Sequence, residues 1–184
     1  MTEVEDIGLI DAIKKNDTRA IGKLIEDNAN NPKVLFKKDA KGNTALQHLI
    51  LHLHEKLPES ETLNSNLYQV HILRLIELGS AEQVFSPNNS FDTALHRVAE
   101  HSNPNDEVST TIVAELIEKA IAAGRVDLLS TKNLANETPL RLAEMQENHT
   151  IADQLRAIPP FFSGAEQTNP PSDEFVVALG LQAK

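Results

Sequence analysis

Three histidines, His48, His52 and His54, have the residue type and spacing that could bind a metal ion in this 184-residue chain. His48 and His52 are four residues apart, so on a helix they would share one face and could chelate Zn²⁺, with Glu55 as a further ligand. The sequence has no His-Glu-x-x-His pattern and no distant carboxylate at a telling spacing. We therefore predict packing or solvated roles for these histidines, with no metal and no cofactor. A metal-dependent enzyme that uses His48 and His52 is the alternative.

Other catalytic chemistry has less support in the sequence. His96 has no Ser or Cys nucleophile at a motif spacing from it. No phosphate-binding loop, no G-x-G-x-x-G and no G-x-S-x-G pattern is present. The chain has no Cys, which excludes disulfides and cysteine-based zinc sites. We predict that the protein is not an enzyme.

The composition indicates a folded, acidic protein. Hydrophobic residues make up 40% of the chain and aromatic residues only 4%, which suits a core of closely packed aliphatic side chains. The formal net charge of −10 would repel phosphate backbones, so nucleic acid is not an expected partner. No apolar run is long enough to predict a membrane span, and the acidic N-terminus does not resemble a signal peptide. We predict a cytoplasmic monomer.

A short motif recurs three times along the chain. Thr-(Ala/Pro)-Leu begins at Thr44, Thr93 and Thr138, and the apolar residues that follow recur at helical spacing. Thr is a good N-cap, and Gly42 before the first motif suits a turn with positive φ. Five residues before each Thr stands Asp or Asn, and nine residues before it an aliphatic residue. These positions are Asp39, Asn88 and Asn133, and Leu35, Val84 and Leu129.

Each motif helix is followed by a second apolar segment. We predict second helices over residues 67–78, 110–123 and 149–157. Residues 55–66 and 103–109 are rich in turn formers and charge, and we predict that they are surface loops between the helices. The expected core residues of the second helices are Val70, Leu73, Leu75, Ile76, Ile112, Val113, Leu116, Ile117, Ile121, Ile151 and Leu155.

The repeated motif resembles the ankyrin repeat. Residues 39–46, Asp-Ala-Lys-Gly-Asn-Thr-Ala-Leu, are similar to the ankyrin signature Asp-x-x-Gly-x-Thr-Pro-Leu-His-x-Ala. The segments that begin at Thr93 and Thr138 look like two more copies. Residues 75–80, Leu-Ile-Glu-Leu-Gly-Ser, are similar to the ankyrin ending Leu-Leu-x-x-Gly-Ala, and the N-terminal stretch fits the register of a further repeat without the Thr cap.

This resemblance implies an all-α ankyrin-repeat solenoid over residues 1–158. Its four repeats would span approximately residues 5–38, 39–87, 88–132 and 133–158. The sequence departs from the family at Phe91 and Asn136, which replace the turn Gly. The Thr-to-Thr spacings of 49 and 45 residues also exceed the ankyrin period of about 33.

The resemblance also implies a function, which is binding to another protein. Ankyrin proteins usually contact partners through the turn tips and the exposed face of the first helix of each repeat. Carried over to matching positions, the expected contact residues are Ala40, Lys41, Asn43, Leu51, His52, Asn89, Ser90, Asp92, Glu100, His101, Leu134, Ala135, Glu137, Met145 and Gln146.

Residues 159–184 form an extension rich in Pro and Phe. It could cap the last repeat, which would otherwise expose an apolar face, or it could recognise a partner. The expanded repeats and the Val/Leu-Phe element before the turn also resemble ankyrin effectors of intracellular bacteria. That resemblance implies an export signal in the extension and delivery into a host cell.

Overall fold

The computed structural model describes residues 8–55, 62–104 and 106–158. Within these ranges the secondary-structure elements are all helical, and there is no strand. The predicted all-α class is confirmed. Eight helices form four consecutive pairs, and three short helical turns connect one pair to the next. The pairs are α1 (Leu9–Lys14) with α2 (Thr18–Asp27), α3 (Ala45–Glu55) with α4 (Thr62–Leu78), α6 (Ala94–His101) with α7 (Glu107–Ala122), and α8 (Pro139–Met145) with α9 (His149–Arg156). The connecting turns are η1 (Pro32–Phe36), α5 (Ala81–Val84) and η2 (Val126–Ser130).

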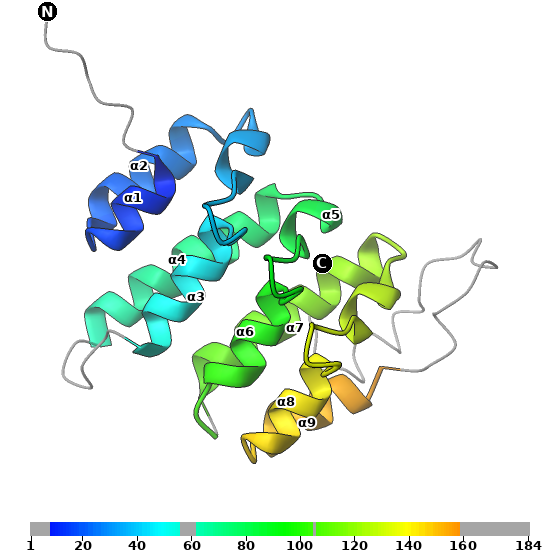
Figure 1. Cartoon of the computed structure of the whole chain (residues 1–184). Coiled ribbons are helices and arrows are strands. Elements are labelled where there is room, and N and C mark those ends of the chain that lie inside the picture. Colours follow the sequence, from blue (N-terminus) through cyan, green and yellow to red (C-terminus); the bar gives the residue numbers. More distant parts are fainter. Residues whose placement is uncertain (1–7, 56–61, 105, 159–184) are drawn as a thin grey trace, which may run out of the picture.

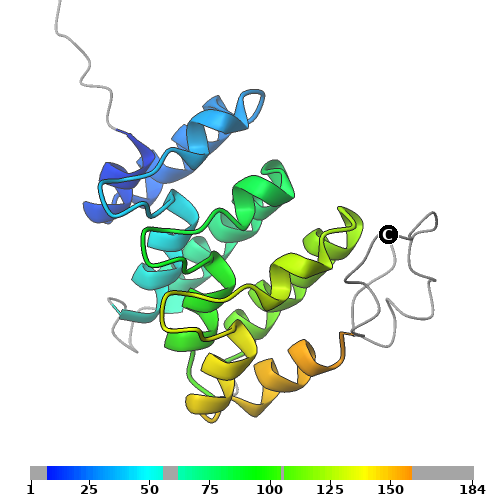
Figure 2. The ribbon, with the colours of Figure 1, turned by 45° about the vertical axis from the view of Figure 1, so that its right-hand side comes forward.

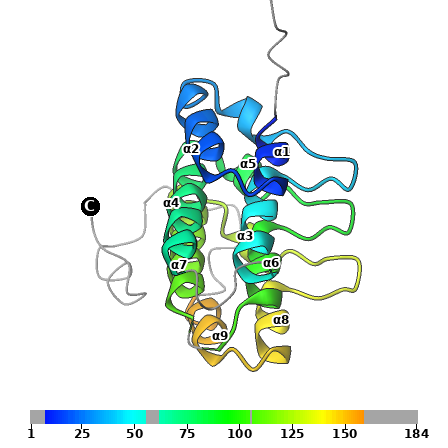
Figure 3. The same ribbon diagram turned by 90° about the vertical axis from the view of Figure 1, so that its left-hand side faces the viewer.

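The four pairs stack in chain order and form two layers (Figures 1 and 2). One layer contains the first helices α1, α3, α6 and α8, and the other contains the second helices α2, α4, α7 and α9 (Figure 3). Helix α3 packs on α4 within its own pair and on α1 and α6 of the neighbouring pairs. Three loops project to one side of the first-helix layer (Figure 3).

The first helices start where the repeated Thr predicts. Helices α3, α6 and α8 begin directly after Thr44, Thr93 and Thr138. Thr138 Oγ1 accepts a hydrogen bond from the Arg141 N–H at 3.2 Å. Thr93 forms a reciprocal capping box with His96, in which the side chain of each residue bonds the backbone of the other. The free N–H groups of the first turn are thus satisfied locally, which explains why the motif fixes these helix starts.

Most predicted core residues are buried. The three aliphatic residues nine positions before each Thr lie in the connecting turns and pack into the core, as do all the predicted core residues of α7 and α9. In α3, Leu46, Leu49 and Ile50 are fully buried between the two layers. The helical periodicity therefore predicted the inner faces of these helices correctly.

Helix α4 is the exception. Val70 was expected to face the core, but 59% of its surface is exposed. Tyr68 and Ile72 are fully buried in its place, and the Tyr68 hydroxyl donates a hydrogen bond to Asn16 Oδ1 in the first pair. The prediction failed because α4 carries apolar residues on two faces, so periodicity alone does not select the inner one.

The predicted surface loops between the helices are partly helical. Helix α4 begins at Thr62 and α7 at Glu107, so they contain 17 and 16 residues, compared with 10 in α2 and 8 in α9. The extra residues of the two central repeats therefore lengthen the second helices. Residues 56–61 and 105 lie outside the described residues. So do residues 159–184, on which the capping, recognition and export predictions fall. Among the described helices, none has the length and hydropathy of a membrane span.

Candidate functional site

The three projecting loops, residues 37–44, 86–93 and 131–138, are closed by the same hydrogen bonds. The residue five positions before each Thr accepts two backbone N–H groups at its side-chain oxygen, at 2.9 to 3.0 Å. Asp39 Oδ1 bonds Lys41 and Asn43, Asn88 Oδ1 bonds Ser90 and Asp92, and Asn133 Oδ1 bonds Ala135 and Glu137. Each loop is therefore held by its own Asp or Asn side chain.

Neighbouring loops are also bonded to one another. Asn88 Nδ2 donates to Asn43 Oδ1 at 2.9 Å, and Asn133 Nδ2 donates to Asp92 Oδ1 at 3.1 Å. The backbone N–H of Leu134 donates to the Ser90 carbonyl at 2.9 Å, and an equivalent bond joins the first two loops. The loop tips are therefore fixed relative to one another before any partner arrives.

The first helices contribute to the same network. Gln47 of α3 donates from Nε2 to the Asp92 carbonyl of the next loop at 2.6 Å, and its Oε1 accepts the Thr44 N–H. His96 of α6 occupies the equivalent position: its Nε2 donates to the Glu137 carbonyl at 3.2 Å, and its Nδ1 accepts the Thr93 N–H. Both bonds require a neutral imidazole with the proton on Nε2. Burial lowers the pKa of His96 from its usual value, which favours this neutral form.

We expect His96 to make folding sensitive to acid. Because its pKa is lower in the folded state, the unfolded chain binds the proton first. The contribution of His96 to stability is therefore present above its unfolded pKa of about 6.5 and is lost as the pH falls below that value. In His96→Gln the amide can make both bonds, as Gln47 does, without titrating. Urea denaturation between neutral and mildly acidic pH should show a smaller loss in the variant.

His71 provides the internal reference for that comparison. Burial also lowers its pKa, and it is present in both proteins, so some acid sensitivity should remain in His96→Gln. An identical loss of unfolding free energy in the two proteins would contradict a neutral His96 in the folded state.

Most residues expected to contact a partner lie on the loop tips or on first-helix ends. Eight are exposed: Ala40, Lys41, Asn89, Ser90, Leu134, Ala135, Met145 and Gln146. Four are half-buried: Leu51, Glu100, His101 and Glu137. Three are buried: Asn43, His52 and Asp92.

The three buried residues must be removed from the expected contact set. Asn43 and Asp92 accept hydrogen bonds from the Asn side chain of the following loop, and Asp92 also pairs with Arg97 at 3.2 Å. His52 lies against the Tyr68 ring, with 5.1 Å between ring centroids. Their side chains are enclosed by contacts that hold the repeats together.

Phe91 is an exposed aromatic residue on a loop tip that is absent from the expected contact set. This Phe stands at the tip of the second loop, where the first loop has Gly42, with φ of +64° and 56% of its surface exposed. Leu134 is 70% exposed and lies on the adjacent loop tip. Its backbone N–H donates to the carbonyl of Ser90, the residue directly before Phe91. The replacement of the turn Gly by Phe was visible in the sequence and was the signal for this residue.

The histidine cluster does not converge on one point. His48 Nε2 contacts Asp39 Oδ2 at 2.9 Å, His52 lies against Tyr68, and His54 Nε2 contacts Ser109 Oγ at 3.3 Å. Among the described residues, no group of three or more His, Cys, Asp or Glu side chains is arranged to hold a metal ion. The two central histidines of the metal hypothesis thus engage different elements.

Ser109, His54 and Asp106 together have the residue types of a hydrolytic triad. In a hydrolytic triad the serine hydroxyl would donate its proton to the histidine, here His54. Ser109 Oγ instead donates to Asp106 Oδ2, at 2.5 Å. Ser109 is fully buried, so a substrate carbonyl cannot reach its hydroxyl. Asp106 also accepts the Val108 N–H as the N-cap of α7. This geometry fits a helix start and does not fit nucleophilic catalysis.

No protein-family model matches the chain, and no curated protein matches it significantly. The function proposed for the loop face, which comprises the three loop tips and the exposed ends of the first helices, therefore depends on its geometry and on the repeated motif.

Proposed function

We propose that the chain is an ankyrin-type repeat module that binds a partner protein through its three loop tips and the exposed ends of its first helices. The repeated loop chemistry and the Thr caps support the ankyrin assignment, because they recur at matching positions in three successive units. The observation that carries the binding function is Phe91, an exposed aromatic residue in left-handed backbone.

Phe91 is costly in the unbound protein. A side chain larger than that of Gly in the left-handed region costs roughly 1–2 kcal/mol. With 56% of its surface exposed, Phe91 recovers only part of that cost from burial. Backbone strain of this kind concentrates at binding sites, and aromatic residues are typical anchors of protein interfaces. Burial of the ring by a partner would offset the strain energy of this backbone conformation.

The surroundings of Phe91 suit an interface. Leu134 adds exposed apolar surface on the adjacent loop tip, while Lys41 and Asn89 supply exposed polar groups on the first two tips. The bonds between loops fix this surface in advance, which lowers the entropy lost when a partner binds.

Phe91→Gly tests this proposal because its effects on stability and on binding should have opposite signs. Gly removes the strain, so the free energy of unfolding should rise by about 1 kcal/mol. Loss of the ring should weaken partner binding by about tenfold or more, as expected for an interface anchor. The partner is first captured with the full-length chain and identified, and Kd is then measured by calorimetry with the purified partner.

Leu134→Ser should weaken the same complex, and Val34→Ser is the matched control. Val34 is an exposed apolar residue on η1, away from the Phe91 and Leu134 tips. Unchanged affinity in both tip variants would overturn the proposed face. If removal of residues 159–184 alone abolishes binding, that extension is the recognition element.

A further inference from the structure

Helix α4 has a second apolar stripe that the core covers only in part. Leu67 and Val70 are 44% and 59% exposed, and Leu73 is half-buried. The three residues follow one another at intervals of three, so they lie along one side of the helix. A helix that is apolar on two faces usually packs on both of them. On α4 the inner face is covered by the first-helix layer, whereas this stripe is open.

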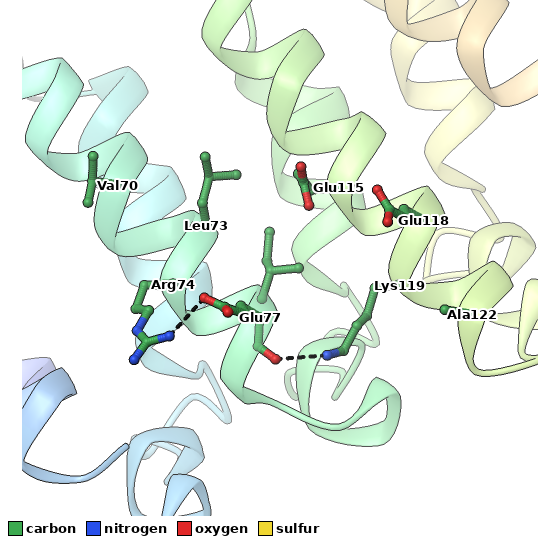
Figure 4. A pocket seen from close by; sticks show the side chains of 9 residues that line it. Val70, Leu73, Arg74, Glu77, Glu115, Glu118, Lys119 and Ala122 are labelled. Carbon is green, nitrogen blue, oxygen red and sulfur yellow. Dashed lines mark hydrogen bonds and ion pairs between the residues drawn. The ribbon is translucent and has the colours of Figure 1, made fainter. Parts of the chain in front are cut away.

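The stripe leads into a groove between α4 and α7 (Figure 4). The groove has a volume of about 520 Å³, and Leu73 and Ile76 of α4 and Ala122 of α7 contribute its apolar lining. It belongs to the second-helix layer, whereas the loops project from the first-helix layer (Figure 3). The groove is thus a surface separate from the loop face that carries Phe91.

Carboxylates outnumber cations around the groove. Arg74 is held between the carboxylates of Glu26 and Glu77, at 3.1 and 2.8 Å. Glu115 and Glu118 extend along α7 beside the apolar lining (Figure 4), and neither forms an ion pair with another described residue.

Lys119 is the second cation of this surface, and its Nζ donates to the Glu77 carbonyl at 3.0 Å. Three carboxylates, Glu77, Glu115 and Glu118, therefore line the groove together with two cations, Arg74 and Lys119. An apolar groove with surplus negative charge at its edge is complementary to a ligand that is apolar on one side and basic at its borders.

We propose that the α4–α7 groove binds a basic amphipathic helix of another protein. The apolar side of that helix would cover Val70 and Leu73, and its Lys or Arg residues would pair with Glu115 and Glu118. Laying such a helix into an apolar groove is a common mode of peptide recognition.

Charge disfavours two other possible occupants of the groove, a second copy of this chain and its own C-terminal extension. A second copy of this chain would bring the same carboxylates and a net charge of −10 against them. Residues 159–184 carry three acidic residues and a single Lys, so they do not complement the groove either.

The test uses two fluorescent peptides with the same helical pattern, one of Leu and Lys and one of Leu and Glu. Each is titrated with the full chain and followed by fluorescence anisotropy. The Leu/Lys peptide should bind at least about tenfold more tightly than the Leu/Glu peptide. Methyl NMR of the full chain should show the largest shifts at Val70, Leu73 and Ile76. Largest shifts elsewhere would overturn the location.

Variants separate the groove from the general acidity of the protein. Glu115→Lys with Glu118→Lys should weaken the Leu/Lys peptide at least about tenfold. The matched control reverses Asp11 and Glu147, two exposed acids outside the groove lining. Equal losses in the two double variants would show that only the net charge matters and would overturn the proposal. Phe91→Gly should leave peptide binding unchanged, so the loop face and the groove can fail independently.

Discussion

Leu95→Ala should lower the free energy of unfolding by about 3–5 kcal/mol, the range for a large-to-small change in a packed core. Leu95 is fully buried in α6, which packs on α3, α7 and α8. Truncation removes three carbon atoms at a point where several helices meet, and the surrounding repeats cannot collapse onto the cavity without shifting one another. Equilibrium urea denaturation followed by far-ultraviolet circular dichroism would measure the loss.

Leu46 and Leu140 occupy the equivalent positions of the neighbouring units and serve as comparisons. Leu46 is fully buried and should behave like Leu95, whereas Leu140 in α8 is only partly buried. We expect Leu140→Ala to cost roughly 1–2 kcal/mol, because less apolar surface leaves water at that site. Losses below about 0.5 kcal/mol at both buried positions, the size of an ordinary surface effect, would contradict the full burial of Leu46 and Leu95 in the core.

Gly42→Ala should destabilise the protein by about 2–3 kcal/mol, through two causes that add. Gly42 has φ of +76°, so Ala would be strained in any surroundings. A Cβ at this position would also meet the side-chain oxygen of Asn89 and lie 2.8 Å from its backbone nitrogen. The first two loops would have to separate, and the Asn89 N–H bond to the Lys41 carbonyl would weaken.

Gly124→Ala separates strain from crowding. Gly124 also has positive φ, at +64°, but a Cβ there would have no heavy atom within 4 Å. Its variant should therefore show only the conformational cost of about 1–2 kcal/mol. The excess loss in Gly42→Ala measures the contact between neighbouring loops. Equal melting temperatures for the two variants would show that the loops are not in close contact in solution.

Local chemistry explains what could be predicted. Thr138 bonds a backbone group three residues away, and Asn133 bonds groups two and four residues away. Such partners are fixed by the order of residues, so the starts of the first helices after each Thr, the loop closures and the buried positions of α7 and α9 follow from spacing. The face of α4 did not follow, because Val70 and Tyr68 are both apolar and only the position of the first pair decides which is covered.

The features of the candidate sites also divide into those that follow from the sequence and those that depend on the tertiary structure. The sequence by itself determined the all-helical class of the described residues and three like loops, because these properties depend on contacts within one unit. Tertiary structure decided that Asn43 and Asp92 are buried, since their partners stand 45 and 41 residues further along the chain. It also decided that Phe91 is exposed and that α4 and α7 leave a groove. These outcomes depend on how closely one helix pair stacks on the next, and that distance is set by side chains from separate repeats packing together.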